Sequence, residues 1–282
     1  LKFMQRELLT NDGAMVASLS AIDDRNIEGG YYLWSRDELK KNLSQEEKNI
    51  VEIAWLSQSA ASFDAGYLPV WQQGYATQNN LSESDHKLID SARLKMLKRR
   101  QQDRKLPVDD KLLAGWNGLA LSAFSLAAKA YDIPEFKNTA DSIASYITES
   151  LMQNGKLVRA YKSGKPIGQA SLADYAYVAE GFWDYYQLTG NSDDMAISRS
   201  MLEAGWVNYY SPAGWSLGNM AGFQSGGREG IIADGPKSSP SSVLLGISHK
   251  MAKASGDKEL ENKVKTALGF DVLELNRNVF WY

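Results

Sequence analysis

The chain lacks cysteine entirely and carries only two histidines among its 282 residues. Without thiols, this chain cannot form disulfide bonds, thiolate metal sites or a cysteine nucleophile. The two histidines, His86 and His249, show neither the HxxE nor the HxH spacing that is typical of a metal site. We therefore expect no metal and no cofactor.

An excess of charge is also missing, because 31 Lys and Arg face 34 Asp and Glu, for a net charge of −3. Such a chain has no general attraction for nucleic acid or an anionic membrane, so we expect neither as a partner. No apolar run approaches the roughly 20 residues that cross a bilayer.

The first residues, LKFMQRELLTNDG, lack the basic start and apolar stretch of a signal peptide and resemble the end of a helix. We expect the chain to be part of a longer protein in the cytoplasm. The absence of cysteine leaves the periplasm as an alternative.

What the sequence has in abundance is a repeat of paired helical patterns. Helical spacing is followed by a short polar break and a second helical pattern, with breaks near Asp132, Gly190 and Gly256, about 60 residues apart. The predicted helices span 117–131 and 137–151, 172–188 and 195–210, and 241–254 and 260–270. The first helix of each pair has few charges, which is typical of a buried helix.

Alternating inner and outer helices predict an all-α fold, an α/α toroid of helical hairpins similar to an (α/α)6 barrel. Four or five hairpins fit this chain, so either the ring is open or its remaining helices lie outside the chain. We expect one domain over 1–282, with an irregular segment at 1–105 and regular hairpins at 106–282. Short β-like runs at 155–168 and 213–240 predict β-hairpin loops at one mouth of the ring.

The irregular segment also carries local signals. Residues 46–63 and 82–103 have helical patterns, and Ser35 is suited to cap a short helix at 37–43. Residues 28–34, EGGYYLW, predict a strand with Tyr32 and Trp34 on one face.

Four stretches together resemble the YyaL-like family, the bacterial relatives of spermatogenesis-associated protein 20. The most specific is RKLPVDDKLLAGWNGLALSAFSLAAKAY, in which PVDDK and WNGL lie at fixed spacing. The others are SLSAIDDRNIEGGYYLWSRDEL, SLADYAYVAEGFWDYYQLTGN and ADGPKSSPSSVLLGISHKMAKASGD. The resemblance implies an α/α toroid, and a thioredoxin-like domain as its partner in the full-length relative. It also implies a fold like those of N-acylglucosamine 2-epimerases and six-hairpin glycosidases.

Acidic residues stand before each predicted inner helix. Asp109 and Asp110 precede the first, Asp174 begins the second and Asp234 precedes the third. Each could cap its helix or form an ion pair. If equivalent helix starts line one mouth, Asp109, Asp110 and Asp174 are candidates for acid and base, since glycoside hydrolysis uses two carboxylates.

Candidate substrate-binding residues surround these acids. Aromatic rings and amides suit the faces and hydroxyls of sugars, although they also suit ordinary packing. The set comprises Trp116, Asn117, Tyr175, Arg159, Asp234, Tyr32 and Trp34. Arg159 could instead pair with one of the acids.

Three functions remain open from the sequence. The first is a carbohydrate-binding or carbohydrate-processing cleft with hydrolase-like acid and base chemistry. The second is a non-catalytic binding module that accompanies a thioredoxin-like domain. The third is a sugar epimerase, whose paired histidines would have to be His86 and His249.

Overall fold

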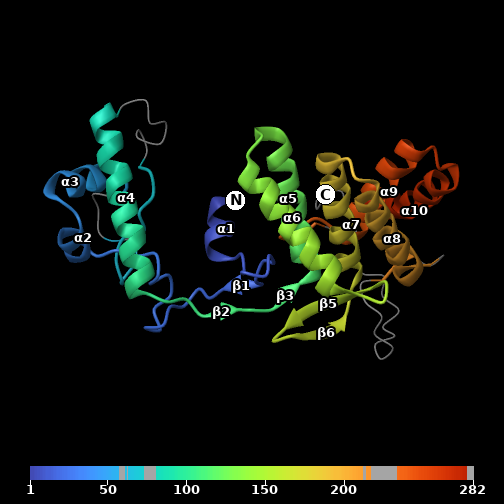
Figure 1. Ribbon diagram of the computed structural model, residues 1–282, viewed down its shortest axis with the longest axis horizontal. Coiled ribbons are helices and arrows are strands. Elements are labelled where there is room, and N and C mark those ends of the chain that lie inside the picture. Colours follow the sequence, from blue (N-terminus) through green and yellow to red (C-terminus); the bar gives the residue numbers. More distant parts are fainter. Residues whose placement is uncertain (57–60, 62, 73–80, 212–213, 217–233, 278–282) are drawn as a thin grey trace. The chain divides into compact units, whose positions relative to one another are not determined.

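A computed structural model describes residues 1–56, 61, 63–72, 81–211, 214–216 and 234–277, with side chains up to residue 269 (Figure 1). The chain divides into two compact units. The larger unit comprises 1–17 and 110–282, and the smaller comprises 18–109. The sequence boundary expected near 105 lies close to this division. A single domain over 1–282 stays a prediction.

The larger unit is built from consecutive helical hairpins. They are α5 (Ala114–Tyr131) with α6 (Pro134–Tyr146), α7 (Leu172–Thr189) with α8 (Ser192–Tyr209), and α9 (Pro240–Ser255) with α10 (Lys258–Arg277). Helices α5, α7 and α9 end at Asp132, Gly190 and Gly256, each in the left-handed conformation that closes a helix C-terminus. The predicted helix pairs and their spacing are therefore confirmed.

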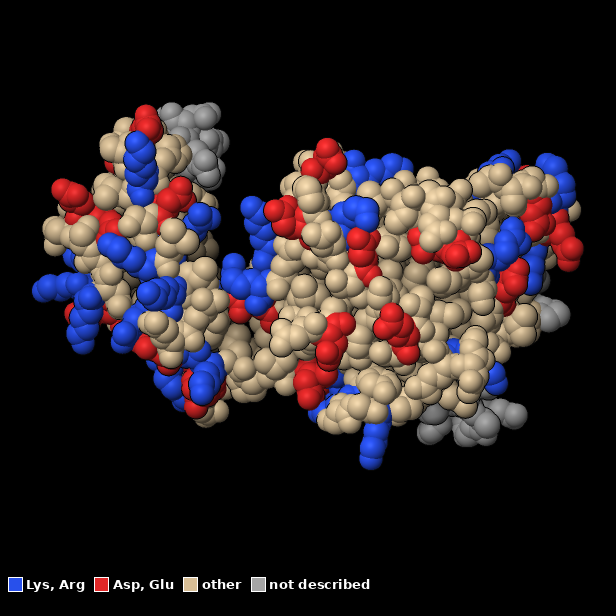
Figure 2. All heavy atoms as spheres, viewed as in Figure 1, with Lys and Arg blue, Asp and Glu red and all other residues tan. Residues whose placement is uncertain are grey.

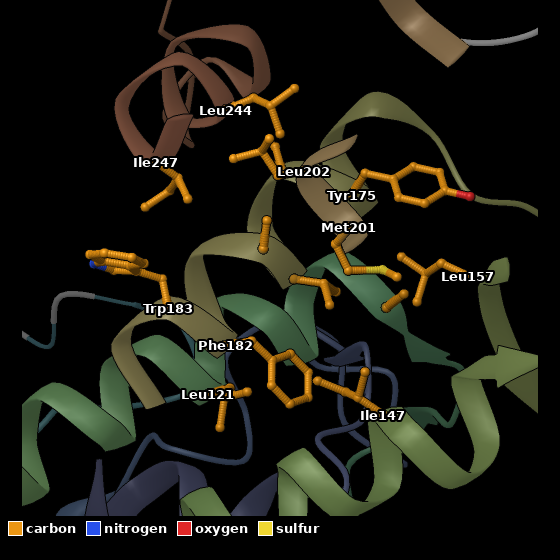
Figure 3. Packing of buried hydrophobic residues seen from close by; sticks show 14 of the residues in the cluster. Leu121, Ile147, Leu157, Tyr175, Phe182, Trp183, Met201, Leu202, Leu244 and Ile247 are labelled. Atoms are coloured by element: carbon orange, nitrogen blue, oxygen red, sulfur yellow. The ribbon is translucent and has the colours of Figure 1, made fainter. Parts of the chain in front are cut away.

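Helix α7 lies at the centre of the packing and contacts α5, α8 and α9. Phe182 on α7 points toward Leu121 of α5 and Ile147, while Leu202 of α8 faces Leu244 of α9 (Figure 3). The first helix of each pair is thus the inner one, as its low charge predicts. The part of the chain that the structure describes is mostly helical, while closure of these hairpins into a ring stays a prediction.

A small sheet lies beside the starts of α5 and α7. Strand β5 (Lys156–Lys162) pairs antiparallel with β6 (Lys165–Gln169), with β3 (Leu112–Leu113) and with β4 (Met152–Gln153). The hairpin predicted for 155–168 is confirmed. Between α6 and β4, residues Ile147–Leu151 form a π-helix. The larger unit also contains α1 (Lys2–Glu7) and the pair β7 (Tyr210–Ser211) and β8 (Gly214–Trp215). Most of the predicted loop 213–240 lies outside the described residues.

The smaller unit has its own apolar core under α2 (Arg36–Asn42), α3 (Gln45–Ala54) and α4 (Glu83–Asp103). Strand β1 (Ser18–Leu19) pairs with β2 (Val108–Asp109). Each helix begins with a capping box, at Ser35, Ser44 and Ser82. The predicted helix at 82–103 and the short helix with its cap at Ser35 are confirmed. The helix predicted for 46–63 is shorter than expected, because it ends at Ala54.

The strand predicted for residues 28–34 is wrong, because the structure has turns there and only isolated bridges at Glu28 and Trp34. The buried Asp23 carboxylate accepts the backbone N–H groups of Arg25 and Ile27, which folds the chain into a loop. Arg104 donates to the carbonyls of Gly30, Tyr31 and Leu33 in this loop, and it lies over the Trp34 ring. These contacts replace the pairing of a strand.

Among the described helices, none combines the length and apolar character that a membrane crossing requires.

Candidate functional site

The candidate site lies in the larger unit, where the starts of α5 and α7 are fastened together. Asp174, buried in the first turn of α7, accepts the backbone N–H of Gly115 at 3.0 Å through Oδ1. Its Oδ2 accepts the backbone N–H and the hydroxyl of Ser171, at 2.8 and 2.7 Å. One carboxylate therefore caps α7 and satisfies an unpaired amide of α5.

Arg159 adds the ion pair that the sequence suggested. Its guanidinium on β5 lies 3.5 Å from Asp174 Oδ2, with about half of the arginine side chain exposed. Tyr175, the next residue of α7, is buried and packs its ring against Tyr209. Burial, with the charge of Asp174 as a smaller cause, raises the pKa of the Tyr175 phenol. Both residues support the start of α7.

On the other side of Gly115, the fully buried Asn117 fastens α5 to the N-terminal segment. Its Oδ1 accepts the Met15 N–H at 2.7 Å, and its amide donates to the carbonyls of Met15 and Leu113. Trp116 stands between these two fixed neighbours, yet it is 39% exposed. The backbone of Trp116 is therefore held in place on both sides, while its ring is partly open to solvent.

A groove of about 320 Å³ lies between α7 and α9. It is lined by Glu180, Asp234, Ser238, Ser242, Val243, Gly246, Ile247 and Lys250. Tyr177 connects it to Trp116: its hydroxyl donates to the Ser238 carbonyl at 2.6 Å, and the Lys237 ammonium lies over both rings. The groove thus combines carboxylates, hydroxyls and an ammonium beside an exposed indole.

Glu180 and Asp184 lie on one face of α7, and the pKa of each carboxyl group is raised. Burial, then the charge of Asp184, raises the pKa of Glu180, while Lys250 opposes the shift. Burial also raises the pKa of Asp184, against the hydrogen bond that Ser122 Oγ donates at 2.6 Å and the charges of Lys250 and Lys129. A carboxyl group with a raised pKa is suited to hold or donate a proton near neutral pH.

The remaining candidate acids occupy different environments. Asp110 is exposed and pairs with Lys162 at 2.8 Å, and Asp109 belongs to β2 of the smaller unit. Neither Asp109 nor Asp110 caps α5. The N-cap residue of α5 is Leu113, and the backbone N–H of Gly115 donates to Asp174. Asp234 accepts the Ser239 N–H at 2.7 Å and lines the groove. The N-cap of α9 is Ser239, whose side chain accepts the Ser242 N–H, and not Asp234.

Tyr32 and Trp34 belong to the smaller unit. Trp34 is buried beneath Arg104, whose guanidinium carbon lies 4.4 Å from the indole centroid, and Arg100 lies over Tyr32 at 5.2 Å. His86 lies on α4 of the same unit, whereas His249 is exposed on α9 of the larger unit. Their use as an epimerase pair stays a prediction. Within the described ranges, no cluster of three His, Asp or Glu side chains could hold a metal ion.

Sequence reasoning did not select Glu180 and Asp184, although a signal was present. They are acids four residues apart in LADYAYVAEGFWDYYQL, an otherwise apolar helix. Carboxylates at this spacing share one helix face, so an inner helix that carries them must place them at a polar surface or a site.

Comparison with known proteins agrees with the resemblance seen in the motifs. No family model matches the chain. Mouse spermatogenesis-associated protein 20 is 28% identical over 142 residues, which cover 47% of this chain and 18% of that protein. An uncharacterised protein of Caenorhabditis elegans is 22% identical over 228 residues, covering 68% of this chain and 30% of that protein. The chain is thus distantly similar to these proteins and spans less than a third of their length.

Solved structures with a similar arrangement include a sugar epimerase from a ruminal bacterium, with a TM-score of 0.45 and 17% identity over 56% of this chain and 43% of that one. Another is a GH76 α-mannanase of Bacteroides thetaiotaomicron, with a TM-score of 0.45 and 12% identity over 67% and 52%.

Proposed function

We propose that the larger unit binds carbohydrate along the groove between α7 and α9. The observation that carries this proposal is the exposed Trp116 ring, held between two anchored residues, beside a groove lined by hydroxyl and carboxyl groups. An aromatic face covers the apolar side of a sugar ring, while a few polar groups bind its hydroxyls and set its orientation.

The size of the groove agrees with such a ligand. Its volume of about 320 Å³ is at the lower end of the roughly 300–1,000 Å³ that is usual for small-molecule sites. Ser238 and Ser242 contribute donors and acceptors, while Val243 and Ile247 contribute apolar surface.

In this proposal, acid chemistry belongs to Glu180 rather than to Asp174. Asp174 accepts hydrogen bonds at both oxygens and is buried, so its lone pairs are used to cap helices. Glu180 lines the groove and its pKa is raised by burial. Asp234 supplies a second carboxyl group from a different element, which gives the two acids that glycoside hydrolysis requires.

A glycan and oligosaccharide binding screen on the whole chain tests the proposal, followed by calorimetric titration of each ligand found. Trp116→Ala is expected to weaken binding at least tenfold, a loss of about 1.4 kcal/mol or more. Tyr131→Ala is the matched control, because Tyr131 is 74% exposed at the opposite end of α5. If no oligosaccharide binds, or both variants bind as the wild type does, the proposal fails.

Turnover of a bound oligosaccharide is then tested with Glu180→Gln and Asp234→Asn. Loss of turnover with binding retained would support acid and base roles. Unchanged turnover in both variants would exclude these roles and leave the groove as a binding site.

A further inference from the structure

The ammonium group of Lys237 lies over two aromatic rings at the candidate site. Its Nζ is 5.7 Å from the centroid of the Trp116 ring and 5.4 Å from that of Tyr177. Both distances are within the range in which a ring face attracts a cation. Two rings from neighbouring inner helices therefore share one positive charge.

A short turn brings Lys237 to this position. The Gly235 N–H donates to the Lys237 carbonyl at 3.0 Å, and Asp234 accepts the Ser239 N–H at 2.7 Å. The backbone of the turn is therefore held by its own hydrogen bonds. The Lys237 residue itself is exposed, so its long side chain can leave the rings while the turn stays in place.

Two carboxyl groups lie near the Tyr177 side of this position. Glu180 and Asp234 line the adjoining groove, and the charges of both act on the Tyr177 phenol, whose pKa is raised chiefly by burial. Among the groove-lining residues that the structure describes, Lys250 alone opposes these two acids. Without the Lys237 charge, two carboxyl groups would face a single ammonium group, which favours a cation and disfavours an acidic sugar.

We propose that Trp116, Tyr177, Asp234 and Glu180 form a site for the amino group of a cationic sugar, such as a glucosamine unit with a free amine. In the absence of ligand, the site is occupied by the ammonium of Lys237. This inference rests on the proposed carbohydrate function and specifies its substrate class. The ligand amine replaces one positive charge with another, and no covalent step is involved.

Competition between the two ammonium groups makes the inference testable. Removing the Lys237 charge removes the competitor, so Lys237→Met should bind an amino sugar more tightly than the wild type. A cation–π contact of about 0.5–1 kcal/mol corresponds to a gain of about two- to fivefold in affinity. An N-acetylated sugar has no cation, so its affinity should not rise.

Lys263→Met provides the matched control. The Lys263 ammonium lies 4.7 Å from the Trp206 ring centroid, so this variant removes the same kind of contact elsewhere in the larger unit. Its affinity for every sugar should equal that of the wild type.

The experiment is calorimetric titration of the whole chain at pH 6 with three oligosaccharides: a β-1,4-linked glucosamine tetramer, its fully N-acetylated form and a tetragalacturonate. The amino tetramer is expected to bind tightest and to gain affinity only in Lys237→Met. The inference is overturned if the N-acetylated or acidic tetramer binds as well as the amino tetramer, or if Lys237→Met weakens or leaves unchanged the binding of the amino tetramer. If neutral sugars bind and amines are not preferred, the amino-sugar inference is wrong but the proposed carbohydrate binding is supported. If no oligosaccharide binds, both the inference and the proposed function are wrong.

Discussion

Gly118 of α5 and Gly181 of α7 meet where the two inner helices cross. A Cβ atom placed on Gly181 would lie 2.5 Å from the Gly118 carbonyl oxygen, and one placed on Gly118 would lie 2.5 Å from the Tyr177 carbonyl oxygen. Side chains cannot fit between backbones at this distance, so the crossing requires glycine on both helices. The crossing brings the helix segments that carry Trp116 and Tyr177 together.

We predict that Gly118→Ala and Gly181→Ala each lower the free energy of unfolding by about 1–3 kcal/mol, because the added methyl group overpacks a backbone contact. Gly246→Ala on α9 is the control, since a Cβ there meets nothing within 4 Å. Alanine favours a helix over glycine by up to about 1 kcal/mol, so the control should be neutral or stabilising. Urea unfolding of the three variants measures the difference. Equal stabilities would show that the crossing is looser than described.

A second prediction concerns Asp174. Replacing it with Asn keeps the shape but removes the charge, and it offers an N–H₂ group to a place where only acceptors are needed. Loss of charge-assisted hydrogen bonds to Ser171 and Gly115 should cost about 2 kcal/mol of stability. Asp110→Asn, which breaks an exposed ion pair with Lys162, should cost less than about 1 kcal/mol. Thermal unfolding of both variants gives the comparison, and similar losses would contradict the capping role.

The helices were predictable from the sequence, because their signals are local. Apolar spacing, the cap at Ser35 and the turn at Gly190 all act within a few residues. The roles of the acidic residues could not be predicted from the sequence, because their partners are distant in the chain. Asp174 is 59 residues from the amide of Gly115 that it accepts, and nothing local distinguishes this role from a place in a cleft.

The wrong strand at 28–34 has the same origin. The spacing of its aromatic residues suits a strand. In the structure, the guanidinium groups of Arg100 and Arg104, about 70 residues later in the chain, lie over these rings in cation–π contacts. The pattern therefore reflects packing against arginine side chains of a distant segment. Glu180 and Asp184 are the opposite case, because two acids on an apolar helix could have been recognised from local sequence alone.

A third prediction concerns the acid stability of the smaller unit, through the buried Glu47. Burial acts to raise its pKa, but hydrogen bonds from Lys95, Ser91 and the Ser44 N–H, with the charge of Lys95, lower it from 4.5 to about 2. A carboxyl group with a lowered pKa stabilises the fold above its unfolded pKa. This stabilisation is lost as the pH falls from about 4.5 toward 2. Because Lys95 is half exposed and solvent weakens its ion pair with Glu47, we expect the ionised carboxylate to stabilise the folded unit by about 2 kcal/mol.

Glu47→Gln should therefore destabilise the smaller unit at pH 7 and flatten its dependence on pH between 4.5 and 2. Glu46→Gln is the control, because Glu46 is exposed in the same first turn of α3. Amide hydrogen exchange of α3 and α4 reports on this unit alone. A Glu47→Gln curve parallel to that of the wild type would contradict the prediction.

The last prediction concerns Asp184, whose pKa shift has the opposite sign. Burial raises its pKa, so the unfolded chain ionises more readily than the folded one. Stability is therefore unaffected at low pH and falls as the pH rises from about 3.8 through the raised folded pKa. The Asp184→Asn side chain cannot ionise and can still accept the Ser122 hydroxyl. The stability of this variant should therefore equal that of the wild type at pH 3 and exceed it at pH 7.

The Ser122→Ala variant tests the same contact from the other side. It removes the donor from a buried carboxylate and should cost about 1–3 kcal/mol of stability at pH 7. Urea unfolding at both pH values, with Asp110→Asn as the exposed control, checks the sign. A variant Asp184→Asn that is less stable than the wild type at pH 7 would mean that the ionised carboxylate stabilises the fold through its contacts with Ser122 and the lysines.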